Sequence, residues 1–168
     1  MKTLLSLMMM SSCGSVLIAC TTTPTETIIT SSMMPAESDA KATVQSVYDG
    51  FAAGDMAMVT GNMSADIIWN EAQGNPYADL NPYVGPEAIL SGLFSRLGGD
   101  WDYFTANPIE YIVDGPRVAV IGQYNAQSTQ TGTVLDAAFV HVWTVEGGKI
   151  TAFQQYTDTA AHVIAMGR

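Results

Sequence analysis

The chain has 168 residues, and 48% of them are hydrophobic, which is typical of a globular protein that buries a core. Sixteen acidic residues against six basic ones give a formal net charge of -10 at pH 7. The few Lys and Arg residues form no cluster that could neutralise phosphates, so the sequence argues against nucleic acid as a partner. The excess of negative charge also argues against electrostatic attachment to an anionic membrane.

The first twenty residues, MKTLLSLMMMSSCGSVLIAC, have the pattern of a bacterial export signal. One Lys precedes an apolar stretch that is too short and too interrupted to be a membrane span. The last four residues, Leu17 to Cys20, resemble the lipobox of bacterial lipoproteins. The resemblance implies that residues 1–19 are a signal peptide and that Cys20 carries a lipid. The alternative is an ordinary signal peptide that is cleaved elsewhere, with Cys20 incidental.

Residues 20–38 are predicted to be the lipidated cysteine and a flexible tether, because they are rich in Thr, Ser and Pro and sustain no period. The only other cysteine, Cys13, lies inside the predicted signal, so the mature chain would have neither a disulfide nor a catalytic thiol. Thr21, in place of an Asp, resembles the outer-membrane sorting class. We therefore expect a folded domain over residues 39–168, anchored through Cys20 at the periplasmic face of the outer membrane.

Three helices are predicted at the start of the domain. The first runs from Ser38, its N-cap, to Gly54 at its C-terminal end. Its apolar side chains recur with the helical period and share one face, namely Ala40, Val44, Val47, Tyr48 and Phe51. Asp55 is expected to cap a short second helix, and Pro86 to begin a third one over residues 85–97.

Strands are predicted after the helices. A short strand is expected from Ile67 to Trp69, and period-two alternation begins after Asp100. The alternation predicts four strands joined by tight turns, over residues 108–113, 118–127, 135–145 and 150–158. Helices followed by a run of antiparallel strands indicate the α+β class, with the helices covering one face of the sheet.

Four segments, VYDGFAAGDMAMV, ADIIWNE, YVGPEAILSGLF and FVHVWTVEGGKITAFQQYTDT, resemble the SnoaL-like branch of the nuclear transport factor 2-like superfamily, which also holds ketosteroid isomerase. The resemblance covers residues 40–160. It implies a cone-shaped fold, in which three N-terminal helices pack on a strongly curved, mainly antiparallel sheet around a mostly apolar pocket. Dimers are common in the superfamily, so the resemblance also implies a homodimer. One fold hosts many activities, so the chemistry must be argued from the site.

The stretch WNEAQGNPY places a carboxylate, Glu71, at the end of an apolar strand. Strand alternation puts Ile67, Trp69 and Glu71 on one face. By the resemblance, Glu71 matches the general-base Asp of ketosteroid isomerase, and burial would raise its pKa and make it a stronger base. The alternative is a Glu that faces water at a strand end. The oxyanion Tyr of the isomerase matches Val47, and Tyr48 lies one residue off, so a steroid-type oxyanion hole is not expected.

A second candidate, His141, lies on the strand AFVHVWTV. Alternation puts four of its residues on one face, namely Phe139, His141, Trp143 and Val145. In the SnoaL-like cyclases a His on this strand works with an Asp on the next strand. His141 matches the His, but Gln155 occupies the Asp position, and Gln takes no proton at neutral pH. The alternative for His141 is a buried ring satisfied by Gln155 or by a Tyr.

Glu71 and His141 are therefore the candidate catalytic residues, and we expect them to titrate together if they share a pocket. The candidate ligand-binding residues are Trp69, Asn75, Tyr77, Trp143 and Gln155. No cofactor and no metal are expected, because His141 and His162 lack metal-ligand spacing with carboxylates and no Gly-rich phosphate loop is present.

Two classes of function stay open. In the first, an enzyme of the isomerase, dehydratase or hydrolase type uses Glu71 to move a proton on a small hydrophobic molecule. In the second, a non-catalytic domain binds such a molecule, or a partner protein, at the cell envelope. Gln155 favours the second class, whereas Glu71 and His141 together favour the first.

Overall fold

The computed structural model describes residues 37–168. The predicted signal peptide, the lipidation site Cys20 and the tether up to residue 36 lie outside the described residues. Within residues 37–168, no helix is both long enough and apolar enough to cross a membrane.

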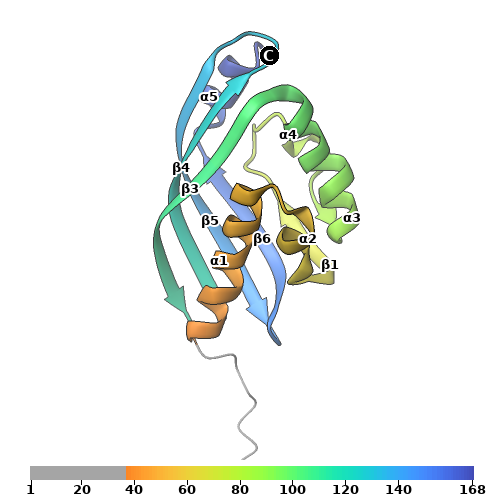
Figure 1. The fold of residues 1–168 in the computed structure, drawn as a ribbon, viewed down its shortest axis with the longest axis vertical. Helices are drawn as coiled ribbons and strands as arrows, with labels where there is room; N and C mark the ends of the chain where they lie inside the picture. The colour runs from red at the N-terminus through yellow and green to blue at the C-terminus, as the bar shows by residue number, and fades with distance from the viewer. Residues whose placement is uncertain (1–36) are drawn as a thin grey trace, which may run out of the picture. The chain divides into compact units, whose positions relative to one another are not determined.

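A six-stranded sheet is the centre of the domain, with the strand order β2-β1-β6-β5-β4-β3 (Figure 1). The strands are β1 (Met63–Asn70), β2 (Tyr83–Val84), β3 (Trp101–Asp114), β4 (Arg117–Ser128), β5 (Val134–Glu146) and β6 (Lys149–Thr157). All neighbouring strands are antiparallel except β1 and β6, which are parallel. The predicted α+β class and the mainly antiparallel sheet are confirmed. The sequence missed β2 and the first half of β3.

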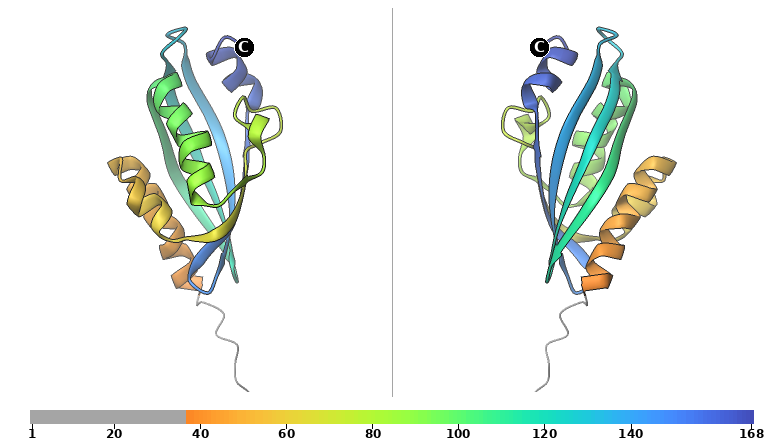
Figure 2. Two further views of the ribbon diagram at one scale, coloured as in Figure 1. Left: turned by 90° about the vertical axis from the view of Figure 1, so that its right-hand side faces the viewer. Right: turned by 90° about the vertical axis from the view of Figure 1, so that its left-hand side faces the viewer.

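The helices lie along the concave face of the sheet and at one end of it (Figures 1 and 2). They are α1 (Glu37–Ala53), α2 (Met56–Gly61), a continuous helical region made of α3 (Pro86–Ile89), the π-helical η2 (Leu90–Phe94) and α4 (Ser95–Asp100), the 3-10 turn η1 (Ala78–Leu80) and α5 (Thr159–Ala165). The three predicted N-terminal helical regions are confirmed. The C-terminal helix α5 was not predicted.

Two of the predicted helix boundaries are confirmed by local chemistry. Gly54 ends α1 with a φ of 70°, and its N–H donates to the carbonyl of Phe51. The Asp55 carboxylate accepts a hydrogen bond of 2.9 Å from the Met58 N–H and so caps α2. The start of α1 differs by one residue from the prediction, because the helix begins at Glu37 and so already includes Ser38, the predicted N-cap.

The core fills the concave side of the sheet, because alternate residues of β4 and β5 are buried along their full length. Gly122 is required at the most crowded point of this face. A Cβ there would lie 2.2 Å from the Phe139 ring and 2.5 Å from the Asn107 carbonyl oxygen. The missing side chain lets the Phe139 ring lie across β4, where it stacks on His141 at a centroid distance of 4.0 Å. Gly122 therefore helps to set the position of a candidate site residue.

The strand register brings distant parts of the sequence together. His141 pairs with Gln155 across β5 and β6, and Trp143 pairs with Phe153. Phe153 also pairs with Trp69 across the parallel β1 and β6. The end of β1 therefore lies beside the middle of β6, which places the strand-end carboxylate next to the two C-terminal strands.

Candidate functional site

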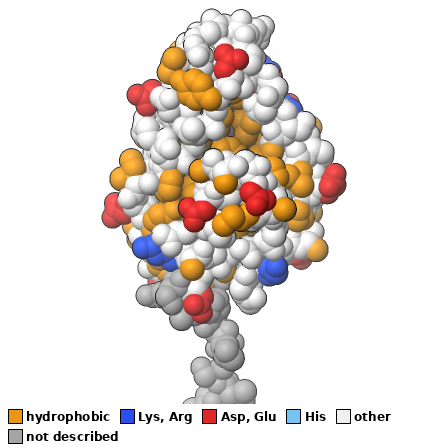
Figure 3. All heavy atoms as spheres, viewed as in Figure 1, with side chains coloured by type: hydrophobic (Ala, Val, Ile, Leu, Met, Phe, Trp, Pro, Cys, Tyr) orange, Lys and Arg blue, Asp and Glu red, His pale blue; other side chains and the backbone are white. Residues whose placement is uncertain are grey.

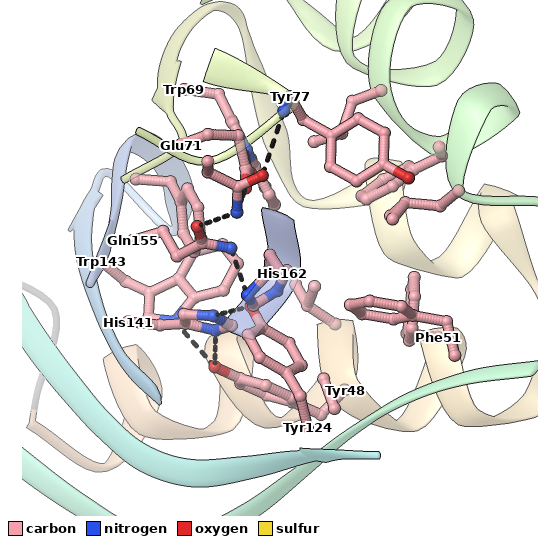
Figure 4. Close-up of a pocket in the computed structure, with 18 residues that line it drawn as sticks. Tyr48, Phe51, Trp69, Glu71, Tyr77, Tyr124, His141, Trp143, Gln155 and His162 are labelled. Carbon is pink, nitrogen blue, oxygen red and sulfur yellow. Dashed lines mark hydrogen bonds between the residues drawn. The ribbon is translucent and has the colours of Figure 1, made fainter. Parts of the chain in front are cut away.

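The concave face encloses a cavity whose walls come from α1, β1, the α3–α4 region, β3 to β6 and α5 (Figure 4). The cavity has a volume of ≈ 60 Å³, which is enough for several waters or the compact end of a ligand. All seven predicted site residues lie in its wall: Trp69, Glu71, Asn75, Tyr77, His141, Trp143 and Gln155. The structure therefore brings them together in one place, while their roles stay predictions.

Much of the lining of the cavity is apolar. Half-buried side chains from α1, from the helical region after β2 and from β3 line it, namely Phe51, Phe94, Leu97 and Phe104. Hydrophobic side chains gather around the middle of the face that Figure 3 shows. Phe51, from the predicted apolar face of the first helix, packs against the core but is half-buried, and its ring is 5.7 Å from that of Phe94. An apolar ligand would find hydrophobic contacts from the entrance inwards.

Glu71 is 4% exposed and points into the cavity, so the alternative of a water-facing strand end is wrong. Trp69 Nε1 donates a 2.7 Å hydrogen bond to one carboxylate oxygen, and Asn75 Nδ2 lies 3.5 Å from the other. Burial raises the pKa of Glu71 from 4.5 to about 7, although the Trp69 hydrogen bond opposes the shift. The expected rise in this pKa is confirmed. A carboxyl group with a pKa near neutrality can either accept or donate a proton.

The main chain of Glu71 is held by one amide side chain. The Glu71 N–H donates to Asn81 Oδ1 over 3.0 Å, and Asn81 Nδ2 donates to the Glu71 carbonyl oxygen over 2.8 Å. Because both main-chain groups of Glu71 are bound to the same side chain, the carboxylate starts from a fixed position. This contact spans ten residues and explains why the loop after β1 stays folded against its strand.

Gln155 connects the Glu71 side of the cavity with the His141 side. Its Oε1 accepts hydrogen bonds from the Ala72 N–H at 3.1 Å and from Asn75 Nδ2 at 2.8 Å, and its Nε2 donates to the Tyr124 hydroxyl at 2.9 Å. A main-chain N–H can only donate, so the Ala72 contact fixes which end of the amide is the oxygen. Gln155 therefore acts here as a fixed bridge between two polar clusters.

His141 is buried between two tyrosines. The Tyr48 hydroxyl lies 2.8 Å from its Nδ1, and the Tyr124 hydroxyl makes a short hydrogen bond with its Nε2. Burial lowers the pKa of His141 from 6.5 to about 3, so the ring is neutral at physiological pH. The expectation that Glu71 and His141 titrate together is therefore wrong. The alternative of a buried ring satisfied by Tyr is confirmed for these contacts.

Three further residues of the cavity were missed or misjudged from the sequence. Tyr48 was placed off the site, yet its hydroxyl meets His141 and also accepts a 3.2 Å hydrogen bond from Trp143 Nε1. Tyr124 sits at an inward position of β4, and alternation alone could have found it. His162 lies on α5, so it could not be placed without that helix.

A wider polar groove lies behind the cavity, with a volume of ≈ 880 Å³. Gln73 and Thr159 are among the residues that line the groove alone, whereas Glu71, Asn75 and Gln155 line both the groove and the cavity. These three side chains are therefore the wall between an apolar interior and a polar exterior. Among residues 37–168, no three His, Cys, Asp or Glu side chains come together as metal ligands would.

Known proteins share both the sequence pattern and the fold of this domain. The model of the SnoaL-like domain matches residues 44–153, more than half of the chain. An NTF2-like protein from Burkholderia thailandensis is 31% identical, with a TM-score of 0.72 over 76% of this chain and 96% of that chain. An NTF2-like protein from Burkholderia pseudomallei is 24% identical, with a TM-score of 0.71 over 77% of this chain and 98% of that one.

A further structure is that of TerC crystallised with polyporic acid. It is 24% identical, with a TM-score of 0.70 over 77% of this chain and 99% of its own. No curated protein matches the sequence. The family match and the common fold together show that this chain belongs to the SnoaL-like domain family and has the NTF2-like fold.

Proposed function

We propose that the domain binds a small hydrophobic molecule in the cavity and that Glu71 transfers a proton on it, as in an isomerase, a dehydratase or a hydrolase. The observation that carries this proposal is a carboxyl group with a pKa of about 7 inside an aromatic, largely apolar cavity. A base is most effective when its pKa lies near the working pH, because the ionised fraction and the driving force for proton transfer are then both substantial.

The contacts of Glu71 favour one oxygen as the reacting atom. Oε1 accepts the 2.7 Å hydrogen bond from Trp69, whereas the contact of Oε2 with Asn75 is longer, at 3.5 Å. Oε2 is thus the less firmly held oxygen and takes a proton from a carbon next to a carbonyl group, while the electron pair of the broken C–H bond moves to the carbonyl oxygen. Return of the proton to the same carbon or to another completes an exchange or an isomerisation.

The proposal is tested by hydrogen–deuterium exchange at carbon. Wild-type domain is incubated in D₂O with acetophenone or 2-tetralone, and deuterium incorporation next to the carbonyl is followed by NMR. We expect Glu71→Gln to lower the exchange rate about 10²- to 10⁴-fold and to leave ketone affinity within about tenfold. Glu87→Gln, at an exposed position of α3, is the matched control. Enzyme-dependent exchange that survives in Glu71→Gln would contradict the role of Glu71.

A second candidate, binding without chemistry, is favoured by the other polar residues of the cavity. Gln155 stands where the cyclases carry an acid, and His141 is held neutral between two tyrosines. TerC, which shares the fold, was crystallised together with a small molecule, polyporic acid. In this case the domain catalyses no exchange, Glu71→Gln binds as the wild type does, and Trp69→Ala weakens binding because it removes buried apolar area.

We also propose that Cys20 is lipidated and anchors the domain to the cell envelope, on the basis of the lipobox resemblance. Cys20→Ser should abolish incorporation of labelled palmitate and should move the protein from the membrane fraction to the soluble fraction. Cys13→Ser is the matched control, since Cys13 lies in the predicted signal. Unchanged fractionation of Cys20→Ser would refute the anchor. The homodimer stays a prediction, which sedimentation of the purified domain would test.

A further inference from the structure

His162 lines the cavity and carries an unused hydrogen-bond acceptor. Its side chain is 1% exposed, and its Nδ1 lies 3.0 Å from the Asp158 carbonyl oxygen. A carbonyl oxygen can only accept, so Nδ1 carries the proton. Burial lowers the pKa of His162, so the ring is neutral and Nε2 is a bare acceptor. Among residues 37–168, Nε2 has no hydrogen-bond partner, although it belongs to a residue that lines the cavity.

The cluster around His141 holds one hydrogen-bond donor more than it uses. Trp143 Nε1 donates to the Tyr48 oxygen, and the fixed amide of Gln155 donates to the Tyr124 oxygen. Two further hydrogen bonds join the tyrosine hydroxyls to His141, one at each nitrogen of its ring. Three protons are available for them, because burial raises the pKa of Tyr48 and of Tyr124 and the neutral ring carries one proton of its own.

One tyrosine O–H is therefore left over, and the tautomer of His141 decides which one. With the ring proton on Nδ1, His141 donates to Tyr48 and accepts from Tyr124, so the Tyr48 proton is free. With the proton on Nε2, the Tyr124 proton is free. Both tyrosines line the same cavity as His162, and the rings of Tyr124 and His162 are 5.5 Å apart between centroids. The residues that line the cavity thus carry one spare donor and one spare acceptor. Figure 4 shows Tyr48, Tyr124, His141 and His162 near one another.

We propose that His162 is a specificity-determining residue and that the cavity selects an apolar ligand with a hydroxyl group. Nε2 of His162 accepts the ligand O–H, and the spare tyrosine O–H donates to an oxygen of the ligand. A hydrocarbon would leave both protein groups buried and unpaired, which disfavours its binding relative to a phenol, an enol or a hydroxyketone. No Lys or Arg of the described residues lines the cavity, so a neutral hydroxyl suits it better than a carboxylate.

This inference rests on the ligand binding proposed above but not on catalysis by Glu71. It is tested with three probes of similar size: ethylbenzene, acetophenone and 4-ethylphenol. Titration calorimetry gives the affinity of each for the wild-type domain and for His162→Phe, which keeps a ring and removes Nε2. We expect the wild type to prefer 4-ethylphenol over ethylbenzene at least about tenfold. In His162→Phe that preference should fall, because only the tyrosine O–H is left to bind the ligand oxygen, while the affinities for ethylbenzene and acetophenone change less than about threefold.

A second measurement uses the unmodified protein, so it does not depend on the folding of the variant. The whole chain contains two histidines, and selective ¹⁵N labelling of histidine gives four ring nitrogens. Addition of 4-ethylphenol should shift the unprotonated Nε2 of His162 as it accepts a hydrogen bond, whereas ethylbenzene should leave it unchanged. His162→Gln, which returns an amide oxygen near the position of Nε2, should recover part of the preference in calorimetry.

The outcomes separate this inference from the proposed function. If ethylbenzene and acetophenone bind but 4-ethylphenol gains nothing, a trapped water satisfies His162 and the inference is overturned while ligand binding stands. If His162→Phe weakens all three probes equally, His162 is only structural and the inference is again overturned. If no probe binds, the proposed ligand binding fails and the selectivity falls with it. A hydroxyl preference that depends on His162, together with the Nε2 shift, supports the inference.

Discussion

The two polar ends of the cavity respond to burial in opposite ways. Glu71 and His141 are equally buried, and each is held by uncharged hydrogen-bonding groups. Burial raises the pKa of Glu71 to about 7 but lowers the pKa of His141 to about 3. The same loss of water thus brings an acid into the physiological range and takes a base out of it. In this cavity the carboxyl group is the titratable residue, and the histidine is a neutral hydrogen-bonding group.

The largest expected effect comes from breaking the bridge between the two ends. Gln155→Met keeps the shape of the side chain but leaves the Ala72 N–H and an Asn75 N–H buried without their acceptor. We expect the free energy of unfolding to fall by roughly 3–5 kcal/mol, as measured by urea denaturation. The control is Gln154→Met on the outer face of the same strand, which should cost about 1 kcal/mol or less. If both changes lower the free energy of unfolding equally, the hydrogen bonds of Gln155 do not stabilise the fold.

A smaller effect should appear in the pH dependence of stability. The pKa of Glu71 is higher in the folded than in the unfolded state, so its stabilising contribution is complete below about pH 4.5 and is lost as the pH rises to about 7. Glu71→Gln should therefore be more stable than the wild type above pH 7, by up to roughly 3 kcal/mol, and should match it near pH 4. Thermal melting across this range gives the comparison.

His141 should produce the opposite slope. Its pKa is lower in the folded state, so stability is lost as the pH falls from about 6.5 towards about 3. In the wild type the two slopes oppose each other between about pH 4.5 and 6.5. In Glu71→Gln the slope from Glu71 is gone and the slopes from His141 and His162 remain, since burial lowers the pKa of both rings. Stability of this variant should therefore rise up to about pH 6.5 and then level off. A wild-type-like profile in this variant would mean that Glu71 does not titrate near neutrality.

The smallest expected effect is that of one hydroxyl on the His141 side. Tyr48→Phe removes the partner of both His141 Nδ1 and Trp143 Nε1, and we expect a loss of about 1–2 kcal/mol of unfolding free energy. Tyr156→Phe, at a side chain that is 57% exposed, is the control and should be nearly neutral. Chemical denaturation of both variants measures the difference. If Tyr48→Phe lowers the free energy of unfolding no more than Tyr156→Phe does, the hydrogen bonds of the Tyr48 hydroxyl do not stabilise the domain.

The sequence predicted the regular parts of this domain because their periods are strong. Alternation placed Trp69 and Glu71, and likewise His141 and Trp143, on the buried face of their strands. The pairing of His141 with Gln155 also followed, since the tight turn after Glu146 fixes the register. The fold class and most of the candidate wall were therefore accessible from local pattern.

The remainder depends on contacts that no local pattern carries. The two residues of β2 and the seven of α5 are too short for a period to be seen, so His162 had no predicted place. Tyr48 was misjudged because an offset of one residue in an alignment says little about where a long side chain ends. Its hydroxyl reaches a residue 93 positions away, and only the packed structure shows that contact.

The shared wall of Glu71, Asn75 and Gln155 makes the ligand range of this domain adjustable from outside. These three residues line both the cavity and the polar groove. A genetic selection for new ligands should return changes in the groove, for instance at Gln73 or Thr159, beside changes in the cavity. Such changes in the groove alter the residues next to Glu71, Asn75 and Gln155 and leave the aromatic lining of the cavity unchanged. Related chains could thus diverge in preference without first losing their cores.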